Sequence, residues 1–418
     1  MRKAFLVLAV LAFCLSFAFA NVTQGQEAKS KDFVLMHDKA GNPAIKKGFE
    51  DLGAALKKDI GMGFTPTVFG DSETHTATVR SALPTSNAPE FFTWWTGERT
   101  LELYKLGLLA DITDVWDKHK DEYDNGLRQI FTYDGKVYGM SQNLNYWVVF
   151  YKKDLFKKLK ISVPKTWNDF IKVCDVIKKA GKTPLWLSTP YRFVTMIMFE
   201  ELMIGQDAAL YEDLCKGKVK YSDPRVKAVF KLWADMIKKG YFSDPAVSIA
   251  TDLPPMMAKN EIAMAVVGTW YYGEILQKGV KQEDLGLFIL PRQSGKKTVI
   301  VETGPILLSA KSPNLSNAKK VLDAMMGPKY SKMFCKAVTA IPTNKKVDTS
   351  FLPTELKNVQ KKVVHENYGL VNRYLENTPV QFNETALDIF AKFMANPDAI
   401  DPILAELDKA QSDFYSKK

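Results

Sequence analysis

Short apolar runs alternate with amphipathic stretches along the first third of the chain. The predicted order is a strand at Phe33–His37, a helix over residues 44–60, a strand at Thr67–Phe69, a helix at Glu73–Leu83, a strand at Phe91–Trp95 and a helix at Leu101–Gly107. This order with short connections predicts a parallel sheet covered by helices. Ligands of such sheets lie beyond the carboxyl ends of the strands. The residues of interest are therefore those that follow the strands, namely His37, Asp38, Asp71, Trp94 and Trp95.

A second series of elements begins after residue 139. We predict a strand at Tyr146–Tyr151 and a helix from Lys165 to Gly181, in which Thr166 caps the first turn and Asp169 follows three residues later. Thr166 and Trp167 are therefore expected to be structural. The remaining predicted elements are strands at Leu185–Leu187, Ile262–Val267, Leu285–Leu290 and Thr298–Val301, a helix at Asn314–Met326, and mostly helix from Glu355 onward.

The first twenty residues have the pattern of a secretory signal peptide. Arg2 and Lys3 precede an apolar run over residues 4–19, and residues 18–20 (AFA) form the small-x-small pattern that precedes cleavage. The alternatives are a retained anchor and a lipoprotein modified at Cys14. The apolar run is shorter than the ~20 residues that span a bilayer, and Phe13 is not the small residue that precedes a lipid-modified cysteine. We expect residues 1–20 to be removed and the mature chain to be periplasmic or extracellular.

Composition and charge narrow the possible functions. The chain has 418 residues, 46% of them hydrophobic, and a formal net charge of +10. Its lysines form scattered doublets and no single basic cluster, so we expect no nucleic-acid binding. The cysteines after the signal peptide are Cys174, Cys215 and Cys335. We expect buried thiols, with a Cys174–Cys215 bridge as the alternative, and no zinc, haem or dinucleotide motif predicts a metal site or a cofactor.

Four segments, in order along the chain, together resemble one family. They are residues 88–95 (APEFFTWW) with 107–112 (GLLADI), residues 133–140 (YDGKVYGM) with 150–156 (FYKKDLF) and 163–167 (VPKTW), residues 257–264 (MAKNEIAM) with 268–270 (GTW), and residues 305–310 (PILLSA). This series is similar to that of the solute-binding proteins of ABC sugar importers, the family that includes the maltose-binding protein. One departure is Lys152, where the family usually has Asn, at a position expected to shape a turn.

The resemblance implies a two-lobed, periplasmic-binding-protein-like α/β fold, in which each lobe is a mixed, mainly parallel sheet flanked by helices. Hinge crossings between the lobes are expected near Ser141–Asn145, Lys297–Glu302 and Ala340–Asn344. One lobe would combine residues 27–140 with 303–342, and the other would combine residues 141–302 with 343–418. A cleft between the two lobes would then hold the ligand.

Sugar recognition requires aromatic rings for the faces of the sugar and polar or charged groups for its hydroxyls. The resemblance implies ligand contacts at Asp38, Trp95, Glu98, Arg99, Asn145, Tyr191, Trp270 and Tyr271. Asn145 stands where the family has a carboxylate, which puts the family's ligand preference in question at this point. Trp147, Glu302 and Arg373 are weaker candidates, for which we expect no direct contact with the ligand.

The resemblance implies a function without catalysis. A sugar or oligosaccharide would be captured by hinge closure and delivered to the membrane permease of an ABC importer, and the protein would act as a monomer. Two alternatives stay open. The same fold could hold a polyamine, a metal or a peptide. A secreted glycoside hydrolase would need two carboxylates about 5–10 Å apart, and no motif marks such a pair.

Overall fold

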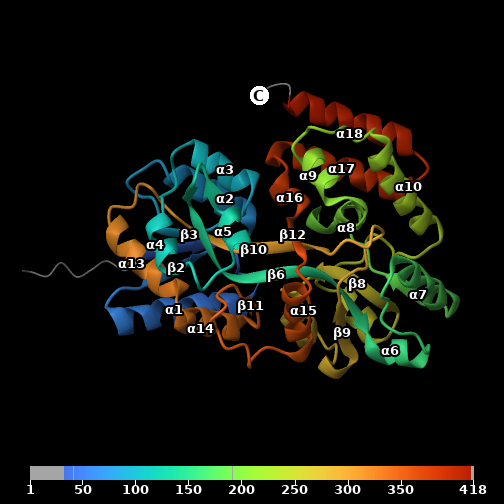
Figure 1. The fold of residues 1–418 in the computed structure, drawn as a ribbon, viewed down its shortest axis with the longest axis horizontal. Coiled ribbons are helices and arrows are strands. Elements are labelled where there is room, and N and C mark those ends of the chain that lie inside the picture. The colour runs from blue at the N-terminus through green and yellow to red at the C-terminus, as the bar shows by residue number, and fades with distance from the viewer. Residues whose placement is uncertain (1–32, 41, 191, 416–418) are drawn as a thin grey trace, which may run out of the picture. The chain divides into compact units, whose positions relative to one another are not determined.

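The structure is a computed structural model that describes residues 33–40, 42–190 and 192–415 (Figure 1). The predicted signal peptide at residues 1–20 and the candidate Tyr191 lie outside the described residues. Within those ranges, none of the helices has both the length and the apolar character needed to cross a membrane.

The strands alternate with helices early in the chain and become longer in its middle. They are β1 (Phe33–His37), β2 (Phe64–Val68), β3 (Phe91–Thr93), β4 (Thr132–Tyr133), β5 (Lys136–Val137), β6 (Gly139–Lys152), β7 (Thr183–Leu185), β8 (Ile262–Gly268), β9 (Leu285–Phe288), β10 (Thr298–Leu308), β11 (Ile341–Pro342) and β12 (Gly369–Asn372). β1 has the predicted bounds. β6 and β10 extend well beyond the strands predicted at Tyr146–Tyr151 and Thr298–Val301.

The helices follow most of the predicted amphipathic stretches. They are α1 (Pro43–Ile60), α2 (Ser72–Ala82), α3 (Glu98–Lys105), α4 (Thr113–Lys118), α5 (Asn125–Ile130), α6 (Lys153–Lys158), α7 (Trp167–Lys179), α8 (Ile197–Gln206), α9 (Ala208–Cys215), α10 (Pro224–Lys238), α11 (Leu253–Ala258), α12 (Tyr271–Gln277), α13 (Leu315–Met326), α14 (Pro328–Val338), α15 (Thr354–His365), α16 (Tyr374–Asn377), α17 (Val380–Ala395) and α18 (Ile400–Tyr415). Thr166 caps α7 as predicted, because its side chain accepts from the backbone N–H of Asp169 at 3.2 Å. Asp71 is likewise a cap, of α2, and accepts from Thr74 N–H at 2.7 Å.

The main sheet is mixed and has the strand order β2-β1-β3-β10-β6-β8-β7. β1 is parallel to β2 and β3, as the βαβ pattern predicts. β6, however, is antiparallel to β10, β8 and β9, and on that side of the sheet β7 and β8 form a parallel pair. Parallel pairing therefore holds among β2, β1 and β3, between β7 and β8 and between β10 and β12, whereas the long strand β6 pairs antiparallel with its neighbours.

β6 and β10 lie side by side and extend from one end of the sheet towards the other (Figure 1). The first half of β10 pairs with β12, and its second half pairs with β3. The register between β6 and β10 shifts between Thr303 and Pro305. Proline has no backbone N–H to give to a ladder, so a break in the pairing is expected there.

The buried apolar side chains form separate clusters. The largest includes Phe150, Phe230 and Phe390, and a second includes Trp116 and Phe334. A third, smaller cluster contains Trp94 and Leu103 of the α3 region. β6 and β10 supply residues to both of the larger clusters. The division into lobes of residues 27–140 plus 303–342 and 141–302 plus 343–418 stays a prediction.

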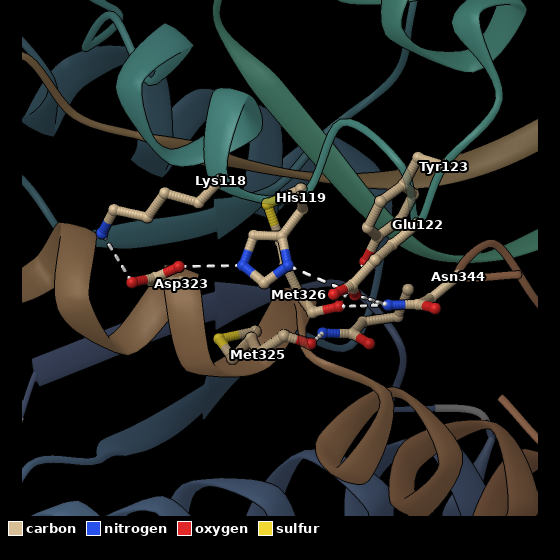
Figure 2. A network of polar contacts seen from close by, with 9 residues as sticks. Lys118, His119, Glu122, Tyr123, Asp323, Met325, Met326 and Asn344 are labelled. Atoms are coloured by element: carbon tan, nitrogen blue, oxygen red, sulfur yellow. Dashed lines mark hydrogen bonds and ion pairs between the residues drawn. The ribbon is translucent and has the colours of Figure 1, made fainter. Parts of the chain in front are cut away.

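A polar network fixes the chain just after β11 (Figure 2). The side-chain amide of Asn344 donates to Oε2 of Glu122 at 2.5 Å and to the carbonyl of Met326 at 2.8 Å. His119 lies between Oδ1 of Asp323, at 2.8 Å, and Oε2 of Glu122, at 3.3 Å. The third predicted crossing is thereby held against α13 and the end of α4.

Two further side-chain predictions concern the cysteines and Lys152. The structure confirms buried free thiols, and so no bridge, at Cys174, Cys215 and Cys335. Lys152 ends β6, is 1% exposed, and pairs with Asp154 at 3.2 Å and Asp284 at 3.5 Å. Lys152 therefore holds the turn into α6, in keeping with its expected structural role.

Candidate ligand-binding site

One group of candidate residues surrounds the start of α3. The ring of Trp95 is half-buried, and the guanidinium carbon of Arg99 lies 4.5 Å from its centre. The buried ring of His75 lies 6.4 Å from that of Trp95. Trp94 is buried, and its indole N–H donates to the carbonyl of Arg99 at 3.2 Å. Trp94 therefore belongs to the core and supports the turn that presents Trp95 and Arg99.

Asp38 adjoins this group at the carboxyl end of β1. Its carboxylate accepts from the Ser72 hydroxyl at 2.5 Å and pairs with the Lys39 ammonium at 2.9 Å. Burial by itself would raise the pKa of Asp38, but Lys39 and the Ser72 hydroxyl outweigh it, so the pKa lies below its ordinary value. Asp38 is therefore an ionised hydrogen-bond acceptor at neutral pH.

Glu98 and Arg99 occupy the first turn of α3. An acidic residue is favoured there because the N-terminus of a helix carries partial positive charge. Burial, with a smaller effect from the charge of Glu98, raises the pKa of Tyr133. Burial lowers the pKa of Arg99, and the charge of Glu376 acts in the opposite direction. The candidates of this group therefore lie together, next to a carboxylate supplied by α16.

A second group of residues surrounds Trp270, at the end of β8. The half-buried indole of Trp270 donates its N–H to Oε2 of Glu302 at 3.2 Å. The same oxygen pairs with the guanidinium of Arg373 at 3.3 Å. Arg373 lies over the ring of Trp147 at 4.7 Å, and the rings of Trp147 and Trp270 are 6.4 Å apart. The three candidates judged weaker from the sequence thus lie directly around Trp270.

Asn145 borders the second group. It is 6% exposed, and its side-chain oxygen accepts from the Thr269 hydroxyl at 3.3 Å. In the register of β6 and β10, Asn145 lies opposite Glu302. Like charges opposite each other across two strands destabilise a sheet. A neutral amide at position 145 is therefore compatible with the carboxylate of Glu302, where a second carboxylate would be repelled.

Buried carboxylates surround Arg373. Glu376 and Glu200 are 4% and 1% exposed. Burial raises the pKa of Glu376, and it raises that of Glu200 to about 8. Burial would lower the pKa of Arg373, but these two carboxylates and Glu302 outweigh it and raise that pKa. Arg373 is thus a buried cation that balances a cluster of acids.

Tyr271 adjoins the second group from the core side, with its ring centre 5.7 Å from that of Trp270. Tyr271 is fully buried, its hydroxyl donates to the carbonyl of Ile249 at 2.5 Å, and its ring packs edge-on against Phe150. This placement favours a structural role, and we leave Tyr271 out of the site. Tyr191 lies outside the described residues.

Surface cavities occur elsewhere. One of about 400 Å³ is lined by Asp244, Met256 and Lys259 near α11, and one of about 570 Å³ lies between α17 and α18. Neither is lined by a candidate residue. In the part of the chain that the structure describes, no three His, Cys, Asp or Glu side chains come together as a metal-binding group.

Two residues of the site were missed from the sequence. His75 lies within a polar helical stretch and has no motif around it, although it faces Trp95. Glu376 lies far along the chain in a helical region, and only the tertiary structure brings it next to Arg99. The one available signal was the position of His75 four residues after Asp71, which follows a predicted strand.

The sequence pattern of one family, described as bacterial extracellular solute-binding protein, matches residues 19–362. An uncharacterized ABC transporter extracellular-binding protein of Pyrococcus horikoshii is 32% identical over 225 residues, which cover 51% of this chain and 49% of that protein. The multiple sugar-binding protein of Streptococcus mutans is 28% identical over 211 residues, or 46% of this chain and 47% of that one. The chain thus spans about half the length of the curated relatives it matches.

Solved structures agree with the sequence comparison at the level of the fold. The bacterial solute receptor AcbH, which has an exclusive substrate preference for β-D-galactopyranose, matches with a TM-score of 0.78 at 19% identity. The match covers 92% of this chain and all of the AcbH chain. It establishes the two-lobed α/β fold. Since the family pattern covers most of its length, the chain belongs to the family of bacterial extracellular solute-binding proteins.

Proposed function

We propose that the protein binds a sugar or oligosaccharide outside the cytoplasm and delivers it to the membrane permease of an ABC importer. One observation carries the proposal. Two half-buried tryptophans, Trp95 and Trp270, each contact a charged side chain, and they pack on different buried clusters. Sugars have flat C–H faces and hydroxyl edges, so they need both an aromatic ring and a charged or polar partner.

The roles of the residues follow from their surroundings. Trp95 and Trp270 would stack on sugar rings. Asp38 is an ionised acceptor for a hydroxyl, and Arg99 is a half-buried donor. Asn145 can both donate and accept, which suits a hydroxyl at the side of the site nearest β10. Glu98 and Tyr191 stay candidate contacts.

Glu302 and Arg373 are better placed to position Trp270 than to touch a ligand. Glu302 accepts the indole N–H of Trp270, and Arg373 holds Glu302 from a buried position. A ring fixed in this way loses less conformational freedom when a sugar stacks on it, which favours affinity.

The relatives give independent support for a carbohydrate. The matched protein of Streptococcus mutans is a multiple sugar-binding protein, and AcbH binds a galactopyranose. The matched protein of Pyrococcus horikoshii is an ABC transporter extracellular-binding protein, which supports an importer as the partner. We infer from the family that the chain acts by binding, without catalysis, as a monomer in the periplasm or the extracellular space.

Closure of two lobes supplies the mechanism, which is a general property of periplasmic binding proteins. A ligand that contacts both groups completes its interactions only when the lobes are closed, so it shifts the open–closed equilibrium toward the closed state. The closed state would then present the surface that the permease recognises.

The test is a thermal-unfolding screen against mono- and oligosaccharides. A sugar present at 100 times its Kd stabilises the folded state by ~2.7 kcal/mol, which raises the unfolding temperature. Trp270→Ala and Trp95→Ala should each abolish this rise at the same sugar concentration. Turnover of an oligosaccharide during the incubation would contradict a purely binding function.

The matched control is Trp167→Ala. Trp167 is also half-buried, but it packs on Phe170 at the start of α7, away from both groups. This variant should keep the full response to sugar. If all three variants keep it, the site lies elsewhere.

A further inference from the structure

Gly97 lies where α3 meets α16. Its backbone has φ 65° and ψ −135°, a region that is essentially restricted to glycine. A Cβ atom built on Gly97 would lie 1.9 Å from the carbonyl oxygen of Glu376, far inside van der Waals contact. The backbones of the two elements therefore touch at a point where no side chain fits.

Hydrogen bonds hold Gly97 in this position. Its carbonyl accepts from the Leu101 N–H at 2.9 Å and from the Tyr133 hydroxyl at 3.2 Å. The first bond begins α3, and the second fixes the glycine to the end of β4. A methyl group on Gly97 could not be accommodated by a small local rotation without breaking these bonds.

The contact joins parts of the molecule that belong to different buried clusters. Leu103 of α3 lies in the small cluster with Trp94, whereas Tyr374 of α16 lies in the largest cluster. α3 and α16 lie side by side in Figure 1, away from the line of β6 and β10. The contact between Gly97 and Glu376 therefore depends on how the two parts approach each other, and not on the strands that connect them.

Charge reinforces the same contact. Arg99, two residues after Gly97, and Glu376 influence each other's pKa values in the directions expected of an attractive pair. Glu98 affects the pKa of Tyr415 at the end of α18, after the larger effect of burial. The start of α3 thus faces the C-terminal helices, and Gly97 is its point of closest backbone approach.

We propose that Gly97 is a positioning residue for closure: its backbone is the point that α16 contacts when the two lobes close. This inference rests on the proposed function, because it assigns the described arrangement to the closed state, which exists in equilibrium with the open state in the free protein and which a sugar favours. A side chain at position 97 would keep α16 away from α3. It would thereby reduce the population of the closed state without removing any group that touches the sugar.

The first experiment needs no ligand. Amide hydrogen exchange of α16 is compared between Gly97→Ala and Gly107→Ala by mass spectrometry. Gly107 lies at the other end of α3, also has a positive φ (66°), and among the described residues nothing lies within 4 Å of a Cβ built on it. We expect faster exchange of α16 in Gly97→Ala than in Gly107→Ala. Equal exchange in the two variants would overturn the inference, whether or not a sugar binds.

The second experiment uses a sugar found in the thermal screen. Titration calorimetry should give a Kd about tenfold higher for Gly97→Ala than for Gly107→Ala, because the apparent Kd rises as the binding-competent fraction falls. X-ray scattering should show compaction on sugar addition in Gly107→Ala and little in Gly97→Ala. Equal affinity and equal compaction would overturn the inference. Failure of the wild type to bind any sugar would contradict the proposed function and leave the exchange result standing.

A milder variant covers the case in which Gly97→Ala does not fold. Tyr133→Phe removes the hydroxyl that holds the Gly97 carbonyl and adds no atom. It should raise α16 exchange above that of Tyr138→Phe, which alters a neighbouring ring of the same aromatic group. Equal exchange in these two variants would overturn the inference.

Discussion

Each half of the candidate site contains a tryptophan covered by an arginine, and the two pairs differ in their surroundings. Arg99 lies 4.5 Å from the ring centre of Trp95, and Arg373 lies 4.7 Å from that of Trp147. Both members of the first pair are half-buried. Both members of the second pair are buried, at 5% and 1% exposure. The geometry of the two pairs is alike, and their burial is not.

Their hydrogen-bonding partners explain the difference in role. Among the described residues, Arg99 has no carboxylate within ion-pair distance, so its N–H groups can be used by a ligand. Arg373 is engaged by Glu302 at 3.3 Å and donates to the Phe193 carbonyl at 3.2 Å. In the proposed site, the same kind of residue pair would therefore serve recognition in one half and support in the other. The side chains of Trp95 and Arg99 can therefore adjust to a ligand, whereas those of Trp147 and Arg373 are already fixed by their protein partners.

The largest expected effect separates the two arginines. Arg373→Met leaves buried carboxylates without their cation, and we expect it to lower the free energy of unfolding by about 3–5 kcal/mol. Arg99→Met removes a half-buried charge and should cost about 1 kcal/mol or less. Urea unfolding monitored by circular dichroism measures both. Losses of equal size would show that the two pairs do not differ in the way their burial indicates.

Sugar affinity should reverse this order. Charge-assisted hydrogen bonds contribute about 1.5–3 kcal/mol, so Arg99→Met is expected to weaken sugar binding by roughly tenfold or more. The folded fraction of Arg373→Met should lose less affinity than Arg99→Met, since Arg373 acts on the sugar only indirectly, through Glu302 and Trp270. An unchanged Kd in Arg99→Met would remove Arg99 from the site.

The next effect concerns pH and the second half. Burial raises the pKa of Glu200 to about 8 from 4.5. Between these two pH values the folded chain keeps a proton that the unfolded chain releases, so this contribution to stability is full below pH 4.5 and is lost as the pH rises to 8. Glutamine resembles the protonated acid and can still accept from the Tyr374 N–H. At pH 8, the free energy of unfolding of Glu200→Gln should therefore be higher than that of the wild type, by about 3 kcal/mol. At acidic pH the two values should be nearly equal.

The control for this prediction is Glu73→Gln, which changes an exposed carboxyl of α2. Urea unfolding of both variants at acidic pH and at pH 8 gives the comparison. A pH-independent difference between Glu200→Gln and the wild type would show that Glu200 is ionised in the folded chain.

Local signals in the sequence account for the parts of the fold that were predicted well. The strand Phe33–His37 is a compact apolar run, and the helix after Thr166 has a capping residue, an amphipathic repeat and a terminal glycine. The lengths of β6 and β10 could not be read in the same way. Gly139–Asn145 has no apolar alternation, and it is extended because it pairs with β10 and β11.

The same limit applies to the site. Trp95 and Trp270 stand in segments whose order along the chain carries the resemblance, and Arg99 lies between two of these segments, so all three could be proposed from the sequence. Trp147 lies within an apolar strand and looks like any core residue there. Glu376 becomes part of the site only because α16 folds back on α3. Contacts between distant segments leave no local pattern.

The smallest expected effect is the pH dependence of stability that arises from His37, next to Asp38 in the first half of the candidate site. Burial lowers the pKa of its imidazole from 6.5 to about 4, with Asp38 acting against that change and Lys39, His75 and Lys46 adding to it. The unfolded chain therefore binds a proton that the folded chain does not, and stability falls as the pH decreases from 6.5 toward 4.

His37→Asn should remove this acid sensitivity. Asparagine keeps an acceptor for the Lys39 N–H, which His37 Nδ1 accepts at 3.2 Å, and it does not titrate. We expect the loss of unfolding free energy between pH 7 and pH 5 to shrink by on the order of 1–2 kcal/mol, measured by urea unfolding at both values. The exposed His365→Asn should leave the loss unchanged. If the two variants respond alike, the acid sensitivity does not arise at His37, and the two halves do not differ in the sign of their pH dependence.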